Sequence, residues 1–442
     1  MTDFSRSDDM TDGVTDGMTD DTADDVTAGT SDVTADGVDL ADPAVHAERD
    51  LAGLWRRLRA DEPVHRQPER DARPGFWVLT RHADVAAAYR DTERFRSDRG
   101  NVLDTLLGGG DSAAGLMLPV MDGARHAALR GQLMKAFSPR VLASVVDSIR
   151  RASREVVVEA LDRGRFDFAR DVAGQLPLRA ICDLLDVPAA DRQRLLDMTS
   201  SALGAQSEAE LREASWVSKA EILLYFSQVA ADRRADPRED VISLLAQCRI
   251  DGVPLTDEEV ILNCYSLILG GDETTRLALI GAVAAFVDHP EQWHAYREGK
   301  VATETAVEEV LRWTTPTLHA GRTAAVDIEL HGRTIRAGDV VTLWNASANR
   351  DEAAFHDPDR FLLSRAPNPH LTFAHGPHFC LGAFLARAEI GAVLRDLREL
   401  VGSIGAAGPP RRIYSNFLTG FGSLPMMWEP PGALNRPFLT RS

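Results

Sequence analysis

The sequence of 442 residues has few cysteines and no long hydrophobic run. Its four cysteines follow no regular spacing, so the sequence predicts a reducing compartment and no disulfide framework. No apolar stretch is long enough to span a membrane, and no basic-then-apolar signal segment opens the chain. We therefore expect a cytoplasmic protein. Apolar residues make up 44% of the chain and charged residues 26%, which is typical of a globular protein.

Basic residues are also scarce, since 49 Lys and Arg face 67 Asp and Glu and the formal net charge is −18. Residues 1–40 contain twelve Asp and one Arg, so about −11 of this charge lies in a stretch of repeated Thr, Asp and Gly. Few large apolar groups are available there to offset chain entropy. The sequence therefore predicts a disordered acidic tail over residues 1–42 and a single globular domain over residues 43–442. Neither part has a basic stripe, so nucleic acid is not an expected partner.

One cysteine near the C-terminus stands in a distinctive setting. Residues 373–382 read FAHGPHFCLG, and the apolar residues after Cys380 recur at helical spacing. At the start of a helix, unpaired N–H groups and the helix dipole favour a thiolate, and a thiolate is a ligand of iron. A small buried cysteine that fills space is the simpler alternative. A zinc site is not expected, because no second cysteine lies at ligand spacing.

This stretch resembles the haem-ligand loop of the cytochromes P450, F-x-x-G-x-H-x-C-x-G. The matching positions are Phe373, Gly376, His378, Cys380 and Gly382. The family usually has Gly where this chain has Ala374, and we expect a slightly different backbone there and not a lost site. The resemblance implies the P450 fold, mainly α with a small β lobe, and haem b (iron protoporphyrin IX) as cofactor. It makes Cys380 the iron ligand and places His378, Phe373 and Gly382 beside the haem.

His126 and Arg130 lie four residues apart, so they share one face of a helix predicted over residues 122–140. Taken alone, such a pair is usually a solvated surface stripe. In the family, an H-x-x-x-R helix at this point holds the haem propionates, which need charged donors in a mostly apolar cavity. The resemblance therefore implies this role for His126 and Arg130. It implies the same role for Arg322, which opens a predicted strand.

A long apolar helix is predicted over residues 256–289, and it contains the sequence LILGGDETTR. Two glycines inside a helix cost about 1 kcal/mol each relative to alanine, and close helix packing would by itself explain them. The sequence also resembles the oxygen-binding groove of the central P450 helix. That resemblance implies that Glu273 and Thr274 form an acid–alcohol pair for proton delivery. We expect Asp272 and Thr275 to be less involved.

The chain between this helix and the haem loop follows the P450 order of an E-x-x-R helix, a sheet and a meander. Glu309 and Arg312 alone could be a surface ion pair. In the family they join an arginine of the meander, so we expect a buried structural network of Glu309, Arg312 and Arg360. Residues 413–428 resemble the terminal hairpin. The expected lining of the substrate pocket comprises Gly270, Thr317, Leu318, Phe417 and Leu418, and His319 is expected at the pocket wall or the surface.

The resemblance implies a monooxygenase that hydroxylates or epoxidises a small-to-medium organic substrate, free or bound to a carrier protein, in secondary metabolism. No flavin or iron–sulfur motif is present, so a ferredoxin or flavodoxin should supply the electrons. It should dock on the face nearest Cys380, where Arg125 and Lys135 are the best candidates. We expect a monomer. Two alternatives are a non-catalytic P450-like module that binds a carrier or partner protein, and a P450 that uses peroxide or rearranges its substrate.

Overall fold

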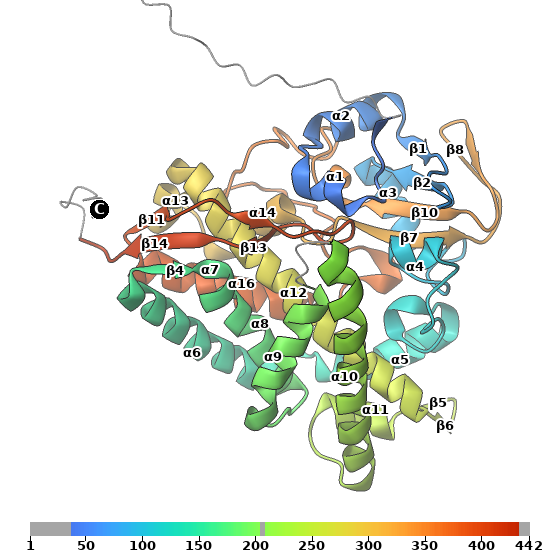
Figure 1. The fold of residues 1–442 in the computed structure, drawn as a ribbon, viewed down its shortest axis with the longest axis horizontal. Coiled ribbons are helices and arrows are strands. Elements are labelled where there is room, and N and C mark those ends of the chain that lie inside the picture. The colour runs from blue at the N-terminus through green and yellow to red at the C-terminus, as the bar shows by residue number, and fades with distance from the viewer. Residues whose placement is uncertain (1–36, 204–207, 433–442) are drawn as a thin grey trace, which may run out of the picture.

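The computed structural model describes residues 37–203 and 208–432 of the chain, and these residues are mainly helical (Figure 1). Among them the α-helices are α1 (Pro43–Glu48), α2 (Ala52–Asp61), α3 (His82–Arg90), α4 (Leu103–Leu107), α5 (Gly123–Ala136), α6 (Pro139–Arg163), α7 (Phe168–Asp171), α8 (Leu176–Leu184), α9 (Ala189–Leu203), α10 (Glu208–Ala235), α11 (Val241–Gln247), α12 (Asp257–Asp288), α13 (Pro290–Arg297), α14 (Thr303–Thr314), α15 (Asn345–Ala348) and α16 (Ala383–Leu400). Short 3-10 turns are η2 (Leu118–Val120), η3 (Ala173–Gln175) and η4 (Gly376–His378).

The strands form one five-stranded sheet and several small ones. The larger sheet has the order β1 (Val64–Gln67), β2 (Phe76–Leu79), β10 (Val340–Trp344), β7 (His319–Ala324) and β3 (Phe95–Arg96). Only the β2–β10 pair is parallel, and β10 sets Val341 opposite Arg322 of β7. The smaller sheets pair β11 (Ser403–Ala406), β14 (Pro425–Glu429) and β4 (Arg165–Asp167); β12 (Arg411–Arg412) and β13 (Phe421–Ser423); β5 (Arg249–Ile250) and β6 (Val253–Pro254); and β8 (Ile328–Leu330) and β9 (Arg333–Ile335). The predicted class, mainly α with a small β lobe, is confirmed.

Helix α12 runs through the middle of the molecule (Figure 1). It is 32 residues long, which corresponds to about 48 Å. Its start is fixed by a capping box, in which the Thr256 side chain accepts from the Glu259 N–H and the Glu259 side chain accepts from the Thr256 N–H. Helices α8, α10, α14 and α16 pack against it. The central helix is therefore held by neighbours along its length.

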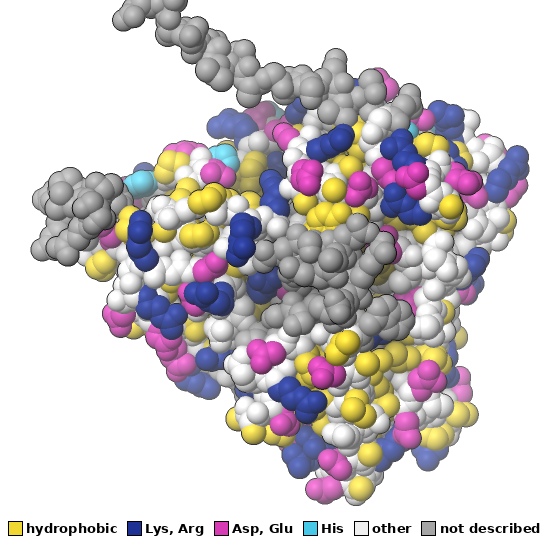
Figure 2. Space-filling view, viewed as in Figure 1, with side chains coloured by type: hydrophobic (Ala, Val, Ile, Leu, Met, Phe, Trp, Pro, Cys, Tyr) yellow, Lys and Arg dark blue, Asp and Glu magenta, His cyan; other side chains and the backbone are white. Residues whose placement is uncertain are grey.

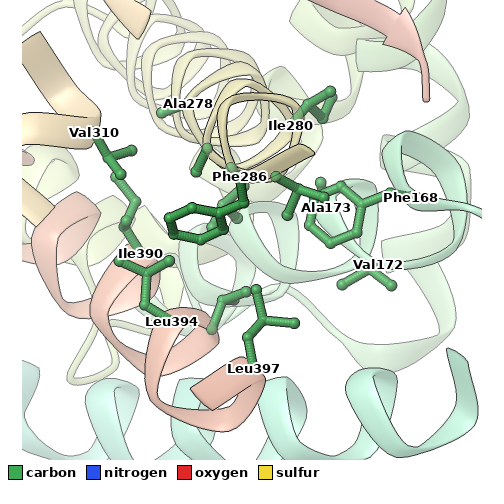
Figure 3. Packing of buried hydrophobic residues seen from close by; sticks show 14 of the residues in the cluster. Phe168, Val172, Ala173, Ala278, Ile280, Phe286, Val310, Ile390, Leu394 and Leu397 are labelled. Carbon is green, nitrogen blue, oxygen red and sulfur yellow. The ribbon is translucent and has the colours of Figure 1, made fainter. Parts of the chain in front are cut away.

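The core joins α12 to the two helices that flank the cysteine loop. Phe286 of α12 is 1% exposed, and it packs among buried apolar side chains of α14 and α16. Figure 3 shows this packing and labels Phe168, Val172, Ala173, Ala278, Ile280, Phe286, Val310, Ile390, Leu394 and Leu397. Burial of each large apolar side chain contributes about 1.5–3 kcal/mol, so this cluster fixes the spacing of the helices that frame the cavity.

The packed part of the chain begins before Pro43, the boundary expected from the sequence. Val38 and Leu40 are each 1% exposed, and they lie in a cluster with Trp55 and Trp344. The expected boundary at residue 42 is thus several residues too late. An acidic, Gly-rich composition dominates the first 40 residues and obscures the two apolar side chains, Val38 and Leu40, that enter the core. The rest of the predicted tail, residues 1–36, lies outside the described residues.

The outer surface mixes charges of both signs. On the face shown in Figure 2, Lys and Arg side chains are interspersed with Asp and Glu side chains. Within residues 37–203 and 208–432, no helix combines the length and the apolar character needed to cross a membrane.

Candidate active site

A cavity of about 310 Å³ lies between α12 and the loop that carries Cys380. Helix α12 supplies one wall, and the cysteine loop and the first turns of α16 supply the facing wall. Helix α5 and strand β7 close one end with cationic side chains. Among the lining residues are Ser266, Gly270, Thr274, His126, Arg130, Arg322, Phe373, His378, Cys380 and Gly382. The sequence-predicted residues of the cysteine loop and of α5 are thus brought to one cavity.

The cysteine loop is closed by its own backbone. The Cys380 N–H donates to the Phe373 carbonyl at 2.9 Å, and the Phe379 N–H donates to the Gly376 carbonyl at 3.0 Å. Gly376 has φ +71°, and a Cβ there would meet the Tyr89 carbonyl oxygen at 2.8 Å. Only glycine fits that position. Gly382 is the N-cap of α16, so Cys380 lies two residues before the N-cap, where the loop becomes a helix as expected.

The Cys380 thiol faces the cavity, which accounts for its exposed surface. Burial raises the pKa of this thiol, and the opposing effects of the Gly382 N–H, Arg130 and Arg387 are smaller. The backbone N–H at the helix start lowers the pKa of the thiol, in the expected direction, but desolvation outweighs this effect in the pocket. A coordinated metal ion deprotonates a thiol outright, so metal binding would supply what the helix start does not.

Ala374 takes the left-handed conformation that the family's glycine would adopt without strain. Its φ is +58°. For an alanine this region costs about 1–2 kcal/mol, partly offset by the lower chain entropy of alanine in the unfolded state. The backbone therefore makes the same turn that a glycine would allow, and Ala374 is strained in it.

Ala374→Gly should therefore raise thermal stability slightly. We expect a gain of up to about 1 kcal/mol in the free energy of unfolding, measured by denaturant titration of the haem-bound protein. Gly376→Ala is the matched opposite change and should destabilise the loop, because its Cβ would overlap Tyr89. A loss of stability in Ala374→Gly would show that the loop does not strain Ala374.

The cationic end of the cavity holds buried donors without partners. Arg322 is 3% exposed, its Nε makes no hydrogen bond to a described residue, and its guanidinium lies over the Tyr89 ring at 5.4 Å. His126 is also 3% exposed, and its Nε2 has no partner among the described residues. Burial lowers the pKa of His126 to about 4, so this imidazole is neutral. Unpaired buried donors are costly, and an anionic group in the cavity would satisfy them.

His378 is held by a carboxylate that the sequence reading did not assign. Its Nε2 lies 2.9 Å from Asp122 Oδ1, and its ring lies 4.3 Å from the His126 ring. Burial would raise the pKa of Asp122, but hydrogen bonds from His378 and the Ser97 N–H outweigh it and lower that pKa. Asp122 therefore orients the His378 imidazole, which lies against the His126 ring. The signal was present in the sequence, since Asp122 is the first residue of the helix predicted over residues 122–140.

Helix α12 separates the two members of the predicted acid–alcohol pair. Thr274 lines the cavity, and its hydroxyl donates to the Gly270 carbonyl at 3.0 Å. Glu273 is 2% exposed, binds Arg276 through both carboxylate oxygens and is not among the cavity-lining residues. Asp272, expected to be less involved, is buried with one oxygen unpaired, and burial raises its pKa to about 7.

The two glycines of α12 have different surroundings. A Cβ on Gly271 would meet the Ile181 side chain at 3.2 Å, so close packing against α8 explains this residue. Gly270 lines the cavity, and a Cβ there would meet nothing within 4 Å. Gly270 therefore leaves open space in the cavity wall.

The cavity lining includes only some of the residues predicted for the substrate pocket. Gly270 and Thr317 line it, whereas Leu318, Phe417 and Leu418 do not. Leu318 is 6% exposed and Leu418 is 5% exposed, and both side chains pack in hydrophobic clusters of the core. The hairpin tip is bridged to Thr317 through Leu418, and the Leu318 N–H donates to the Phe417 carbonyl.

His319 belongs to the core and not to the pocket wall or the surface. It is fully buried and lies 4.8 Å from the Trp344 ring and 5.7 Å from the Phe417 ring. Burial lowers its pKa to about 3, so it packs as a neutral ring.

Comparison with known proteins decides the family. The family model "Cytochrome P450" matches residues 301–397. The cytochrome P450 NovI of Streptomyces niveus is 51% identical over 88% of this chain and 96% of its own length. The chain belongs to the cytochrome P450 family. A methyl-branched lipid omega-hydroxylase of Mycobacterium tuberculosis is 36% identical over 85% of this P450 and 91% of its own chain.

Solved P450 structures share the fold. P450 OxyD, involved in the biosynthesis of vancomycin-type antibiotics, matches with a TM-score of 0.81 and 33% identity over 89% of this chain and all of its own. A Mycobacterium marinum P450 in complex with pseudoionone has the same TM-score and 34% identity over 90% of this chain and all of its own. The predicted fold is confirmed, and the protein is a haem-dependent monooxygenase.

The cavity of this P450 fits a haem. Its cationic end offers Arg130, Arg322 and the neutral His126 to the two propionates, and its floor offers one soft sulfur ligand, Cys380. No group of three or more His, Cys, Asp or Glu side chains among the described residues could hold a bare metal ion. A single thiolate suits iron whose other ligands come from a macrocycle.

An ion network lies behind the cysteine loop of the P450. Glu309 and Arg312 are completely buried and form two hydrogen bonds of 2.8 Å. The third member is Arg365, whose Nε donates to Glu309 Oε2 at 3.0 Å and whose side chain is 5% exposed. Arg360, the predicted third member, is 68% exposed and pairs with Asp357. That prediction was wrong, since only the Arg360 carbonyl joins the network, as an acceptor from Arg312 and Arg365.

Two titratable residues that line the cavity of the P450, Tyr89 and Glu389, were not predicted from the sequence. The Tyr89 hydroxyl donates to Asn345 Oδ1 at 2.8 Å, and no local motif marks this tyrosine. Glu389 of α16 is 2% exposed with one unpaired oxygen, and burial raises its pKa well above the usual value. The sequence could have indicated this residue, because Glu389 is a lone glutamate on the apolar face of that helix.

Proposed function

We propose that this P450 hydroxylates a small-to-medium organic molecule of secondary metabolism, using O₂ and electrons from a separate redox protein. The observation that supports this most is that Cys380 and Thr274 line the same cavity from facing walls. In this proposal Cys380 ligates the haem iron, while His126, Arg130 and Arg322 bind the propionates. Bound haem supplies the centre at which O₂ is activated. Glu309, Arg312 and Arg365 hold the backbone behind the cysteine loop.

Side chains of the protein exclude water from the reacting carbon and deliver protons. Apolar lining residues such as Leu118 and Leu267 keep water from the reacting carbon. The Thr274 hydroxyl, which rests on the Gly270 carbonyl, holds a proton on the cavity side of α12. Glu273 can pass protons towards it only after Arg276 releases its carboxylate. The proton supply is therefore gated by this ion pair.

Relatives support the setting in secondary metabolism. P450 OxyD belongs to the biosynthesis of vancomycin-type antibiotics, and LnmA is a hydroxylase of the leinamycin pathway. The latter is 31% identical to this chain, with a TM-score of 0.76, over 86% of this chain and 97% of its own.

Thr274→Ala tests the proposed role of α12. The variant should bind haem normally but lose coupling of electron consumption to product by about tenfold or more, because a general acid usually contributes 10²- to 10⁴-fold. Consumed electrons should appear as hydrogen peroxide, measured together with product in the same reaction. Thr275→Ala removes the neighbouring hydroxyl and should keep coupling near the parent value. Equal coupling in the parent and Thr274→Ala would remove Thr274 from proton delivery.

The redox partner, a ferredoxin or flavodoxin, should dock beside the cysteine loop. Phe384 in the first turn of α16, just after this loop, is exposed, and so are Met134 of α5 and Val141 of α6, which are next in sequence to Lys135 and Arg140. Arg125, an expected docking residue, forms an ion pair with the buried Glu259, so part of its charge is already neutralised. Lys135 and Arg140 are therefore the stronger candidates.

Lys135→Glu with Arg140→Glu should slow electron transfer from an acidic ferredoxin about tenfold at low salt, because exposed charges mainly accelerate encounter. The effect should vanish at high salt, and substrate affinity should not change. Arg194→Glu on α9 is the matched reversal away from this face and should have little effect. An unchanged rate across the salt range in the double variant would place the docking surface elsewhere.

A further inference from the structure

Several uncharged polar side chains that line the cavity make no hydrogen bond to any described residue. Thr275, beside Thr274, is buried, whereas Asn101, Ser266 and Thr317 are each partly exposed to the cavity. Their neighbour Asn263 shows the usual situation, since its amide donates to the Leu116 and Glu259 carbonyls and accepts from the Leu118 N–H. Polar groups in protein interiors are normally paired. These three are therefore available to a bound molecule.

Each of the three stands on a fixed backbone. The Asn101 carbonyl accepts from the Gly321 N–H at 2.7 Å, and a Cβ on Gly321 would meet that carbonyl at 3.3 Å. Thr317 is bridged to Leu418, and its carbonyl accepts from Asn345. Ser266 lies inside α12. No loop has to be ordered before these side chains bind, which lowers the entropy cost of binding.

The positions of the lining residues on α12 give the distance between Ser266 and Thr274. Ser266, Gly270 and Thr274 line the cavity at intervals of four residues, so they lie on one side of the helix. Eight residues at about 1.5 Å per residue place Ser266 about 12 Å along the axis from Thr274. Gly270 leaves open space between them. A molecule lying along α12 can thus reach both hydroxyls.

The wall around these groups is apolar and uncharged. Leu118, Pro119, Leu267 and Ala320 line it. The charged lining residues, Arg130, Arg322 and Glu389, come from α5, β7 and α16. Among the described lining residues of α12 and of residues 101–119, none is charged. An ionic group buried there would have no partner, which is unfavourable.

We propose that the substrate has an apolar body and neutral hydrogen-bonding groups, one of which Ser266 binds about 12 Å along α12 from Thr274. Asn101 and Thr317, which line the cavity outside α12 and the cysteine loop, bind other polar groups of the substrate. Hydroxyl, carbonyl and amide groups fit these side chains, and carboxylates and amines do not. The inference rests on the proposed function for the position of the oxidised carbon, which lies beside Thr274.

Imidazoles with a tail test the inference without turnover. The haem-bound protein is titrated with 1-alkylimidazoles of increasing length and with their counterparts that end in a hydroxyl. The ring nitrogen ligates iron and shifts the haem absorption, which reports the dissociation constant. The hydroxyl should tighten binding about 2- to 10-fold in one window of tail lengths, because a net hydrogen bond contributes about 0.5–1.5 kcal/mol.

Ser266→Ala should abolish this gain and leave the alkyl probes unchanged. Leu267→Ala is the matched control and should weaken both probes equally, because it removes only apolar contact. Asn101→Leu and Thr317→Val, tested with tails that end in an amide, should each lose part of the gain. The inference is overturned if no tail length prefers the hydroxyl, or if the preference survives in Ser266→Ala. Absence of any imidazole shift would instead contradict the proposed haem enzyme.

Discussion

Replacing Cys380 by alanine is expected to abolish the red-shifted absorption band of the reduced, CO-bound protein. Cys380 is the one cysteine that lines the cavity, and its loop is closed around it by the Phe373–Cys380 and Gly376–Phe379 hydrogen bonds. Without sulfur, no other soft ligand among the described lining residues can replace it. Loss of an outer-shell partner alone costs a metal site about 10- to 100-fold in affinity or activity, so loss of the ligand itself should cost at least about 100-fold in monooxygenation.

Three other cysteines serve as controls. Cys182, Cys248 and Cys264 are buried and lie away from the cavity lining, so their alanine variants should keep the band. Absorption spectra of the four variants, matched for haem content, give the comparison. A normal band in Cys380→Ala would disprove the assigned ligand, as would its loss in Cys264→Ala with Cys380 intact.

The second large effect is expected at Arg365. Its side chain is 5% exposed and donates to the fully buried Glu309, so Arg365→Ala leaves a buried carboxylate with one cation fewer. Breaking a buried ion pair typically costs 3–5 kcal/mol. We expect a loss of this size in the free energy of unfolding, together with weaker haem retention, because the network also receives the Leu362 N–H of the meander.

Arg360→Ala is the matched control, and it separates the structure from the sequence prediction. That side chain is 68% exposed and pairs only with Asp357, so its loss should cost less than about 1 kcal/mol. Urea unfolding of both variants, followed by haem absorbance, measures the difference. If Arg360→Ala were the more damaging change, the assignment of the network would be reversed.

The sequence predicted the parts of the site that a short motif fixes. The Phe373–Gly382 loop, the His126–Arg130 face and Thr274 depend on local spacing, and all of them meet at the cavity. The helix over residues 256–289 was also predicted well, because its capping residues and apolar run are local signals. Short local motifs were therefore enough to predict the fold class and the residues at the centre of the site.

The wrong predictions concern the contact partners of side chains, which depend on how the whole chain folds. Arg360 and Arg365 lie in the same meander, and the backbone path alone decides which side chain turns towards Glu309. Glu273 and Thr274 are neighbours in sequence, but a 100° turn of the helix sends one to Arg276 and the other to the cavity. Whether Leu318, Phe417 and Leu418 line the cavity depends on how the hairpin tip packs on residues 316–318. No pattern in the sequence encodes these choices.

The contact between Gly271 and Ile181 also indicates where this enzyme could be re-engineered. Ile181 of α8 lines the cavity and at the same time packs against Gly271 of α12. Replacing Ile181 by a smaller residue would enlarge the cavity on the side of α8 and leave the helical turn that carries Thr274 in place. Enlarging Gly271 would instead push the two helices apart and displace the proton-bearing hydroxyl. A search for variants that accept bulkier molecules should therefore start on α8 and leave the glycine pair untouched.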